Sequence, residues 1–183
     1  MTRFPRSRGF RLLVVLVFSV PLIVFVESAG GQQTGGGPPT CDAGEHRQFD
    51  FWIGDWKVET PDGKVAGTNR IESILDGCVL MESWEGAGGT DGKSFNMYNR
   101  RNGKWQQTWI DNSGGRLDLV GGFEGGRMVL RGESPARDGG ELRHEIVWEP
   151  LAEGRVKQHW RTSRDGGETW SDAFVGIYVA RPR

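Results

Sequence analysis

The chain has little that would bind nucleic acid or a structural metal. Its 183 residues carry 23 Lys and Arg against 24 Asp and Glu, a formal net charge of −1, whereas nucleic-acid partners call for concentrated positive charge. Its two Cys are too few for a four-ligand structural zinc site. No nucleophile–base spacing or metal-ligand signature is present, so the sequence indicates no catalytic residue, no metal ligand and no cofactor. No stretch repeats its apolar residues every 3.6 positions, which argues against amphipathic helices.

The first 29 residues have the architecture of a signal peptide. Four Arg precede residue 12, and residues 12–26 form an uncharged apolar stretch of 15 residues. That stretch is shorter than the roughly 20 residues that a membrane-spanning helix needs. Ser28, Ala29 and Gly30 offer small side chains for cleavage. We therefore expect export to the periplasm or outside the cell. The alternative is an uncleaved N-terminal anchor, which would be the chain's only contact with a membrane.

Removal of residues 1–29 would leave one domain of 154 residues. Without the four Arg and one Glu of this segment, 19 basic and 23 acidic residues remain, a net charge near −4. Residues 30–44 begin with a Gly-, Gln- and Pro-rich run and are interpreted as a flexible linker, with the folded domain at 45–183. Cys41 and Cys78 are the only cysteines, and in an oxidising compartment an even number favours a disulfide. The alternative is two unpaired thiols.

Short β-runs separated by Gly-rich turns fill the domain. The predicted strands are residues 50–60, 67–75, 78–85, 94–100, 104–111, 116–122, 127–132, 141–149, 155–163 and 173–180. Pairs such as Asp76-Gly77, Asp91-Gly92 and Asn102-Gly103 are typical of tight hairpin turns. Evenly spaced strands of this kind predict an all-β fold, an antiparallel up-and-down β-barrel of about ten strands. A β-sandwich is the alternative, and residues 41–48 are expected to form a short helical turn at one end of the barrel.

Residues 163–170 match the Asp-box pattern Ser-x-Asp-x-Gly-x-x-Trp, with Ser163, Asp165, Gly167 and Trp170 at its defined positions. β-Propellers repeat this motif in successive blades, and here it occurs once. We therefore interpret it as a hairpin turn.

The strand faces predict a pocket inside the barrel. Side chains alternate between the two faces of a strand, so Trp105, Gln107, Trp109 and Asp111 share one face of residues 104–111. Amides and carboxylates alternate in step with tryptophans on other strands too, and buried polar groups need partners. The predicted ligand-binding residues are Trp84, Asn96, Tyr98, Trp105, Gln107, Trp109, Asp111, Gln158 and Trp160. The alternative is a polar network that satisfies itself and only maintains the barrel.

The first β-run carries the pattern Phe-x-x-Gly-x-Trp, from Phe51 to Trp56. Together with Asp76-Gly77-Cys78, Ser94-Phe95-Asn96, residues 105–109 and Gln158-His159-Trp160, this run resembles a bacterial, exported lipocalin-like (calycin-type) β-barrel family of unknown function. The resemblance implies that Trp56 lies across the closed end of the barrel and that Gly54 allows close backbone approach. The lack of a Thr-Asp-x-x-Tyr segment favours a shorter calycin-like barrel over a true lipocalin.

These observations favour a protein that binds a small, partly apolar molecule, such as a lipid or an aromatic metabolite. A haem site is a second hypothesis, for which His46, His144 and His159 are available. A register that brings Trp148 and Trp160 together would send the last two His to opposite faces. Three more hypotheses stay open: a structural barrel without a ligand, an interaction module, and an enzyme using Glu82, Asp111 or His159 as acid–base groups.

Overall fold

The computed structural model describes residues 40–182. The expected signal peptide at residues 1–29 and the first ten residues of the expected linker lie outside the described residues, so the domain boundaries stay predictions. Among the described residues, no helix is long and apolar enough to span a membrane.

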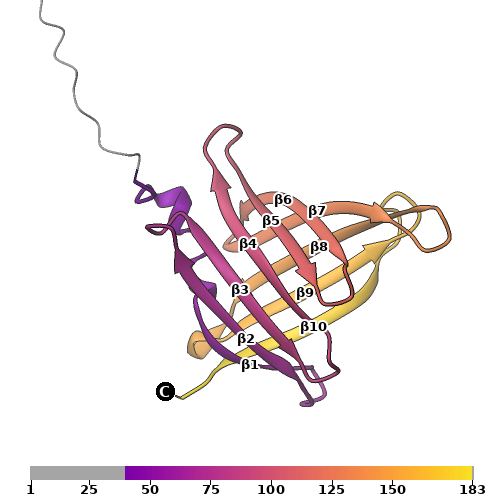
Figure 1. Cartoon of the computed structure of the whole chain (residues 1–183), viewed down its shortest axis with the longest axis horizontal. Helices are drawn as coiled ribbons and strands as arrows, with labels where there is room; N and C mark the ends of the chain where they lie inside the picture. The colour runs from indigo at the N-terminus through magenta and orange to yellow at the C-terminus, as the bar shows by residue number, and fades with distance from the viewer. Residues whose placement is uncertain (1–39, 183) are drawn as a thin grey trace, which may run out of the picture. The chain divides into compact units, whose positions relative to one another are not determined.

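Ten antiparallel strands form a single closed sheet (Figure 1). Each strand pairs with the next one along the chain, and β1 pairs with β10 to close the barrel. The strands are β1 (Gly54–Glu59), β2 (Val65–Ile74), β3 (Val79–Gly86), β4 (Asp91–Asn99), β5 (Lys104–Asp111), β6 (Arg116–Glu124), β7 (Arg127–Pro135), β8 (Glu141–Pro150), β9 (Val156–Ser163) and β10 (Ser171–Ala180). The predicted up-and-down barrel is confirmed and the sandwich is excluded. The fold is consistent with a lipocalin-like barrel.

The predicted first strand begins too early. Residues 50–60 were expected to be extended, but Asp50–Trp52 is a 3-10 helix, η2, and β1 starts only at Gly54. The amide of Trp52 donates to the Phe49 carbonyl at 3.1 Å and that of Ile53 donates to the Asp50 carbonyl at 3.0 Å. The aromatic residues 49, 51 and 52 do not follow the two-residue alternation of a strand. Because the 3-10 turn reverses the direction of the side chains here, Phe49 and Trp52 both pack into the barrel and are fully buried.

The prediction of a turn at Asp91-Gly92 is wrong, because these residues open β4 and the turn precedes them. Gly92 is a site of close packing. A Cβ there would lie 2.3 Å from Cζ2 of Trp109 and 2.8 Å from the carbonyl oxygen of Ile110. The missing side chain therefore lets the Trp109 indole lie against the backbone of β4.

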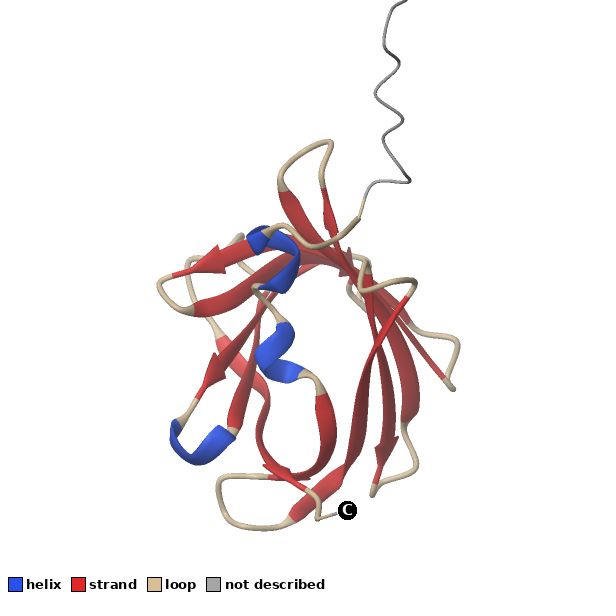
Figure 2. Cartoon of the chain, turned by 90° about the vertical axis from the view of Figure 1, so that its left-hand side faces the viewer, coloured by secondary structure: helices blue, strands red, loops and turns tan. Residues whose placement is uncertain are grey.

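One end of the barrel is closed by η1 (Gly44–Arg47), η2 and aromatic side chains; Figure 2 shows η2 within the ring of strands and η1 at its rim. Phe49 stacks on Trp52 with ring centroids 4.9 Å apart. The Trp56 indole donates to the Trp52 carbonyl at 2.9 Å and covers Gly54, where a Cβ would meet its ring at 2.9 Å. We call Phe49, Trp52, Trp56 and Trp105 the aromatic plug. The roles that the resemblance implies for Gly54 and Trp56 stay predictions.

A disulfide joins Cys41, which precedes η1, to Cys78 in the turn between β2 and β3. The Arg47 guanidinium donates to the Gly77 carbonyl in the same turn. Both interactions attach the N-terminal segment to the barrel. The predicted disulfide is thus present in the structure, and it favours an oxidising environment for the folded protein.

The Asp-box residues form the turn between β9 and β10, as predicted. The Ser163 hydroxyl donates to the Asp165 carboxylate at 2.7 Å, and the Thr169 amide donates to the same carboxylate at 2.9 Å. The Trp170 indole donates to the Gly167 carbonyl at 3.1 Å. Hydrogen bonds, first from the Thr169 hydroxyl, hold the pKa of Asp165 far below its usual range. The motif therefore stabilises the hairpin turn between β9 and β10.

Candidate functional site

A cavity of about 340 Å³ lies inside the barrel between the aromatic plug and the opposite end. Its walls are mostly aromatic and come from β3, β5, β8, β9 and β10: Trp84, Trp109, Trp148, Trp160, Phe174 and Tyr178. Leu117 and Ile146 add apolar surface, and Glu82, Gln107, Asp111 and Gln158 add polar groups. Thr90 and Ala173 border the cavity and are exposed, so it reaches the surface there.

Six of the nine predicted ligand-binding residues border this cavity. They are Trp84, Gln107, Trp109, Asp111, Gln158 and Trp160. The other three point into the barrel but do not border the cavity. Asn96 is fully buried and accepts a hydrogen bond from Gln107 at 2.7 Å, Tyr98 packs edge-on against His46 at 5.1 Å, and Trp105 belongs to the plug. A role in ligand binding stays a prediction for all nine.

A buried hydrogen-bond network surrounds the carboxylate of Glu82, on β3. Asn69 on β2 donates to one carboxylate oxygen at 2.7 Å, and the Ser94 hydroxyl on β4 donates to the other at 2.6 Å. The Asn96 amide donates to Ser94 at 2.8 Å and accepts from Gln107. The hydrogen bonds from Gln107 through Asn96 and Ser94 thus all run toward Glu82, which suits a group that, when ionised, only accepts.

Tyr178 on β10 extends the network to a second cavity-lining amide. Its hydroxyl accepts from Asn69 at 3.2 Å and donates to the side-chain carbonyl of Gln158 at 2.5 Å. Desolvation raises the pKa of Tyr178 well above its usual range, and the nearby charge of Glu82 raises it further. The phenol therefore stays protonated and remains a donor.

Burial also raises the pKa of Glu82, although the hydrogen bonds from Ser94 and Asn69 oppose this effect. The residue is only 5% exposed. Burying a carboxylate without an opposite charge is costly, and the three residues that donate to Glu82 or extend its network, Asn69, Ser94 and Tyr178, are all uncharged. The Glu82 carboxyl group in the cavity wall is therefore either protonated or an uncompensated negative charge.

His144, on β8, is hydrogen-bonded to Trp160, a residue of the cavity wall. Trp160 donates its indole N–H to Nδ1 of His144 at 3.1 Å, and Nε2 of His144 lies 2.8 Å from the Ser134 hydroxyl. Burial lowers the pKa of His144, so the ring is neutral. With Nδ1 accepting, the ring proton must sit on Nε2 and point at Ser134. In this tautomer His144 cannot take a proton from Ser134, so the pair is no nucleophile–base dyad.

The other groups considered for catalysis or haem binding lie apart. His159 faces outward and pairs with Asp172 at 2.7 Å, and its strand neighbour across the ladder is Val147. His144 and His159 lie on opposite faces of the sheet, as follows when Trp148 and Trp160 both face the cavity. Neither of them, nor His46, borders the cavity. Within residues 40–182, no three His, Cys, Asp or Glu side chains lie together so as to hold a metal ion.

Three aromatic residues that line the cavity are missing from the predicted ligand site: Trp148, Phe174 and Tyr178. Alternation along β8 and β10 does carry the signal, because Ile146 and Trp148 share a face, as do Phe174 and Tyr178. Nothing in either strand alone tells which face points inward.

Comparison with protein-family models finds none that matches the chain, and comparison with curated proteins finds no match either.

Proposed function

We propose that this protein is an exported, calycin-type barrel that binds a small, partly apolar molecule in the cavity. The observation that carries the proposal is a cavity of about 340 Å³ that opens at Thr90 and Ala173 and is walled by aromatic rings. Export is supported by the signal-like segment at residues 1–29 and by the Cys41–Cys78 disulfide. Membership of a calycin-type family is supported by the Gly54 and Trp56 pattern and by the barrel.

The cavity has the composition of a ligand site. Small-molecule pockets of about 300–1,000 Å³ are usually apolar with a few oriented polar groups, and this cavity lies at the small end of that range. Gln107 uses its amide nitrogen to reach Asn96, and Gln158 uses its carbonyl oxygen to accept from Tyr178. The remaining carbonyl of Gln107 and the remaining NH₂ of Gln158 are then free to orient a guest.

A structural barrel without a ligand would also contain the hydrogen bonds around Glu82. It would not need tryptophan rings around an open volume, because a barrel whose interior serves only stability gains most from close packing. The volume beside the network therefore favours binding over a purely structural role.

Tryptophan fluorescence provides the test, because indoles line the cavity. A panel of small aromatic and aliphatic compounds should include members that quench the emission saturably. Native mass spectrometry of gently purified protein should reveal a retained molecule. Trp109→Ala should weaken binding about tenfold, equivalent to about 1.4 kcal/mol. Ile110→Ala is the matched control, because Ile110 is the next residue of β5 and is 54% exposed on the outer face.

A panel without any saturable response, together with no retained molecule, would contradict the proposal. Equal affinities of the Trp109→Ala variant and the wild-type protein would place the ligand elsewhere and would also contradict it.

A further inference from the structure

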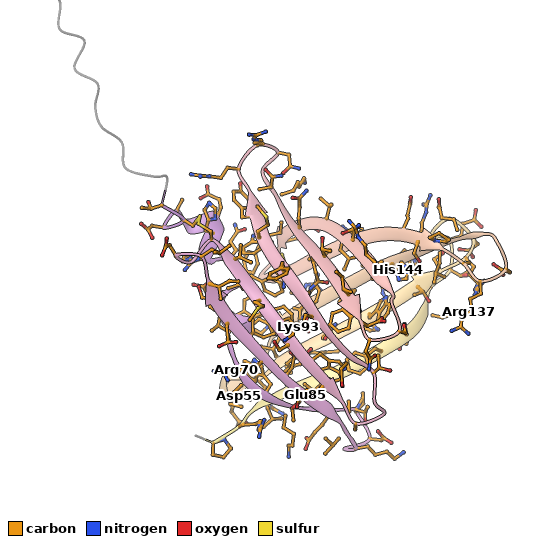
Figure 3. All side chains as sticks on the ribbon, viewed as in Figure 1. Asp55, Arg70, Glu85, Lys93, Arg137 and His144 are labelled. Atoms are coloured by element: carbon orange, nitrogen blue, oxygen red, sulfur yellow. A yellow bond between two sulfur atoms is a disulfide. The ribbon has the colours of Figure 1, made fainter. Side chains whose placement is uncertain are left out.

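The Asp, Glu, Lys and Arg side chains that line the cavity are all acidic. Among the described residues, its lining contains two carboxylates, Glu82 and Asp111, and no Lys or Arg. The basic side chains of the barrel face outward: Arg70 on β2 and Lys93 on β4 are exposed, as is Arg137 between β7 and β8 (Figure 3). Lys93 even donates to Ser83 on the outer face, at 2.8 Å. No described basic side chain therefore offsets the negative charge inside.

Glu82 retains acceptor capacity toward the cavity. Each of its oxygens accepts one hydrogen bond, from Asn69 and from Ser94, whereas an ionised carboxylate offers about four acceptor positions. Glu82 also lines the cavity. A guest that brings a positive N–H donor would both use these positions and compensate the buried charge.

The walls around Glu82 suit a cation for a second, independent reason. The rings of Trp84 and Phe174 meet edge to face with centroids 6.2 Å apart, and Trp109 and Trp160 line the same space. The faces of aromatic rings are electron-rich and attract ammonium groups, indole most strongly. The same rings give the apolar part of a guest a surface to contact.

A second carboxylate lies near the entrance, because Asp111 lines the cavity and its ladder partner Gly92 is two residues from Thr90. Asp111, at the end of β5, accepts hydrogen bonds from the hydroxyl and amide of Ser113, from the amide of Gly115 and from the Trp109 indole. These bonds, first the one from the Ser113 hydroxyl, hold the pKa of Asp111 below its usual range, so this carboxylate is ionised at neutral pH. A negative mouth attracts cations and repels anions, including the carboxylates of fatty acids.

Building on the proposed function, we infer that the ligand is an organic ammonium cation with a small apolar body, bound with its ammonium group at Glu82 and among the indoles of Trp84, Trp109 and Trp160. The amine nitrogen donates to the Glu82 carboxylate, and the apolar body contacts the ring faces.

Matched compounds separate charge from shape. Three series, built on phenylethyl, indolylethyl and hexyl groups, each contain an amine, the alcohol and a carboxylate of similar size. Affinities are measured by titration calorimetry at neutral pH and constant salt. In each series that binds, the amine should bind at least about tenfold more tightly than the alcohol, and the carboxylate should bind most weakly.

Glu82→Gln keeps the shape of the side chain but removes its charge, so it should reduce the amine-over-alcohol preference to about twofold or less. Glu85→Gln is the matched control. Glu85 lies on the same strand but is exposed on the outside (Figure 3), so this variant changes the net charge equally and should keep the preference.

An alcohol or a carboxylate that binds as tightly as its amine would overturn the inference and leave the proposed function standing. So would a preference that survives Glu82→Gln, or a retained molecule that proves neutral or anionic. Absence of binding throughout the three series and the broader panel, with no retained molecule, would overturn both.

Discussion

The buried carboxyl of Glu82 should make the stability of the ligand-free protein depend on pH, and Glu82→Gln should remove that dependence. The substitution preserves the side-chain volume and one acceptor oxygen, which can still receive the hydrogen bond from Asn69. The new NH₂ group replaces the oxygen to which Ser94 donates. Losing that bond should cost about 1 kcal/mol at every pH.

The pH-dependent part has a definite sign. Burial raises the pKa of Glu82 in the folded protein above its ordinary value of 4.5, so the folded state holds a proton that the unfolded chain has released. The stability contributed by Glu82 is fully present below about pH 4.5 and is lost as the pH rises through the folded pKa. One proton limits this loss to about 1.4 kcal/mol per pH unit.

Glu82→Gln should therefore be less stable than the wild-type protein near pH 4.5 and more stable near neutral pH. Urea unfolding between about pH 4.5 and pH 7.5, followed by tryptophan fluorescence with the disulfide intact, measures the difference. All other acidic groups titrate in both proteins, and Tyr178 stays protonated throughout because its pKa is raised. Glu85→Gln should show no such crossover. A stability difference between Glu82→Gln and wild type that stays constant with pH would refute the reasoning.

Two further predictions concern the frame of the site. Replacing Cys41 and Cys78 together by Ser should lower the free energy of unfolding by about 4 kcal/mol, because the bridge closes a loop with a sequence separation of 37 residues. Urea titration measures this loss, and a value below about 1 kcal/mol would contradict the chain-entropy model. Gly92→Ala should destabilise the barrel by about 1–3 kcal/mol and shift the tryptophan emission, because the new Cβ would lie 2.3 Å from the Trp109 ring. Gly88→Ala, whose Cβ would meet nothing within 4 Å, is the control, and equal melting temperatures for the two variants would count against this packing role.

Much of the fold could be predicted from local pattern. Strand and turn signals act over a few residues, so the number of strands and most of their bounds followed directly. Alternation placed Gln107 and Trp109 on one face of β5, and both do border the cavity. The positions of Phe49 and Trp52 inside the barrel could not be predicted in this way. The apolar residues 51–53 are consecutive, and such a run fits neither a strand with one buried face nor a long helix.

Depth along the barrel axis could not be predicted. Trp105 and Trp109 share a strand and a face, yet one packs in the aromatic plug and the other lines the cavity. Which of them meets a guest depends on where η1 and η2 fold into the barrel. The role of Gly92 could not be predicted either. A glycine that permits a turn and one that permits an indole to approach cannot be distinguished in the sequence.

The sequence by itself determined a chain of alternating strands, with indoles and polar side chains directed to one side, because alternation is a property of each strand alone. Only the tertiary structure decided that β1 meets β10 and that Asn69 donates both to the buried carboxylate of Glu82 and to the hydroxyl of Tyr178. Asn69 and Tyr178 are 109 residues apart, and contacts over such separations arise from closure of the whole sheet, which no local pattern encodes.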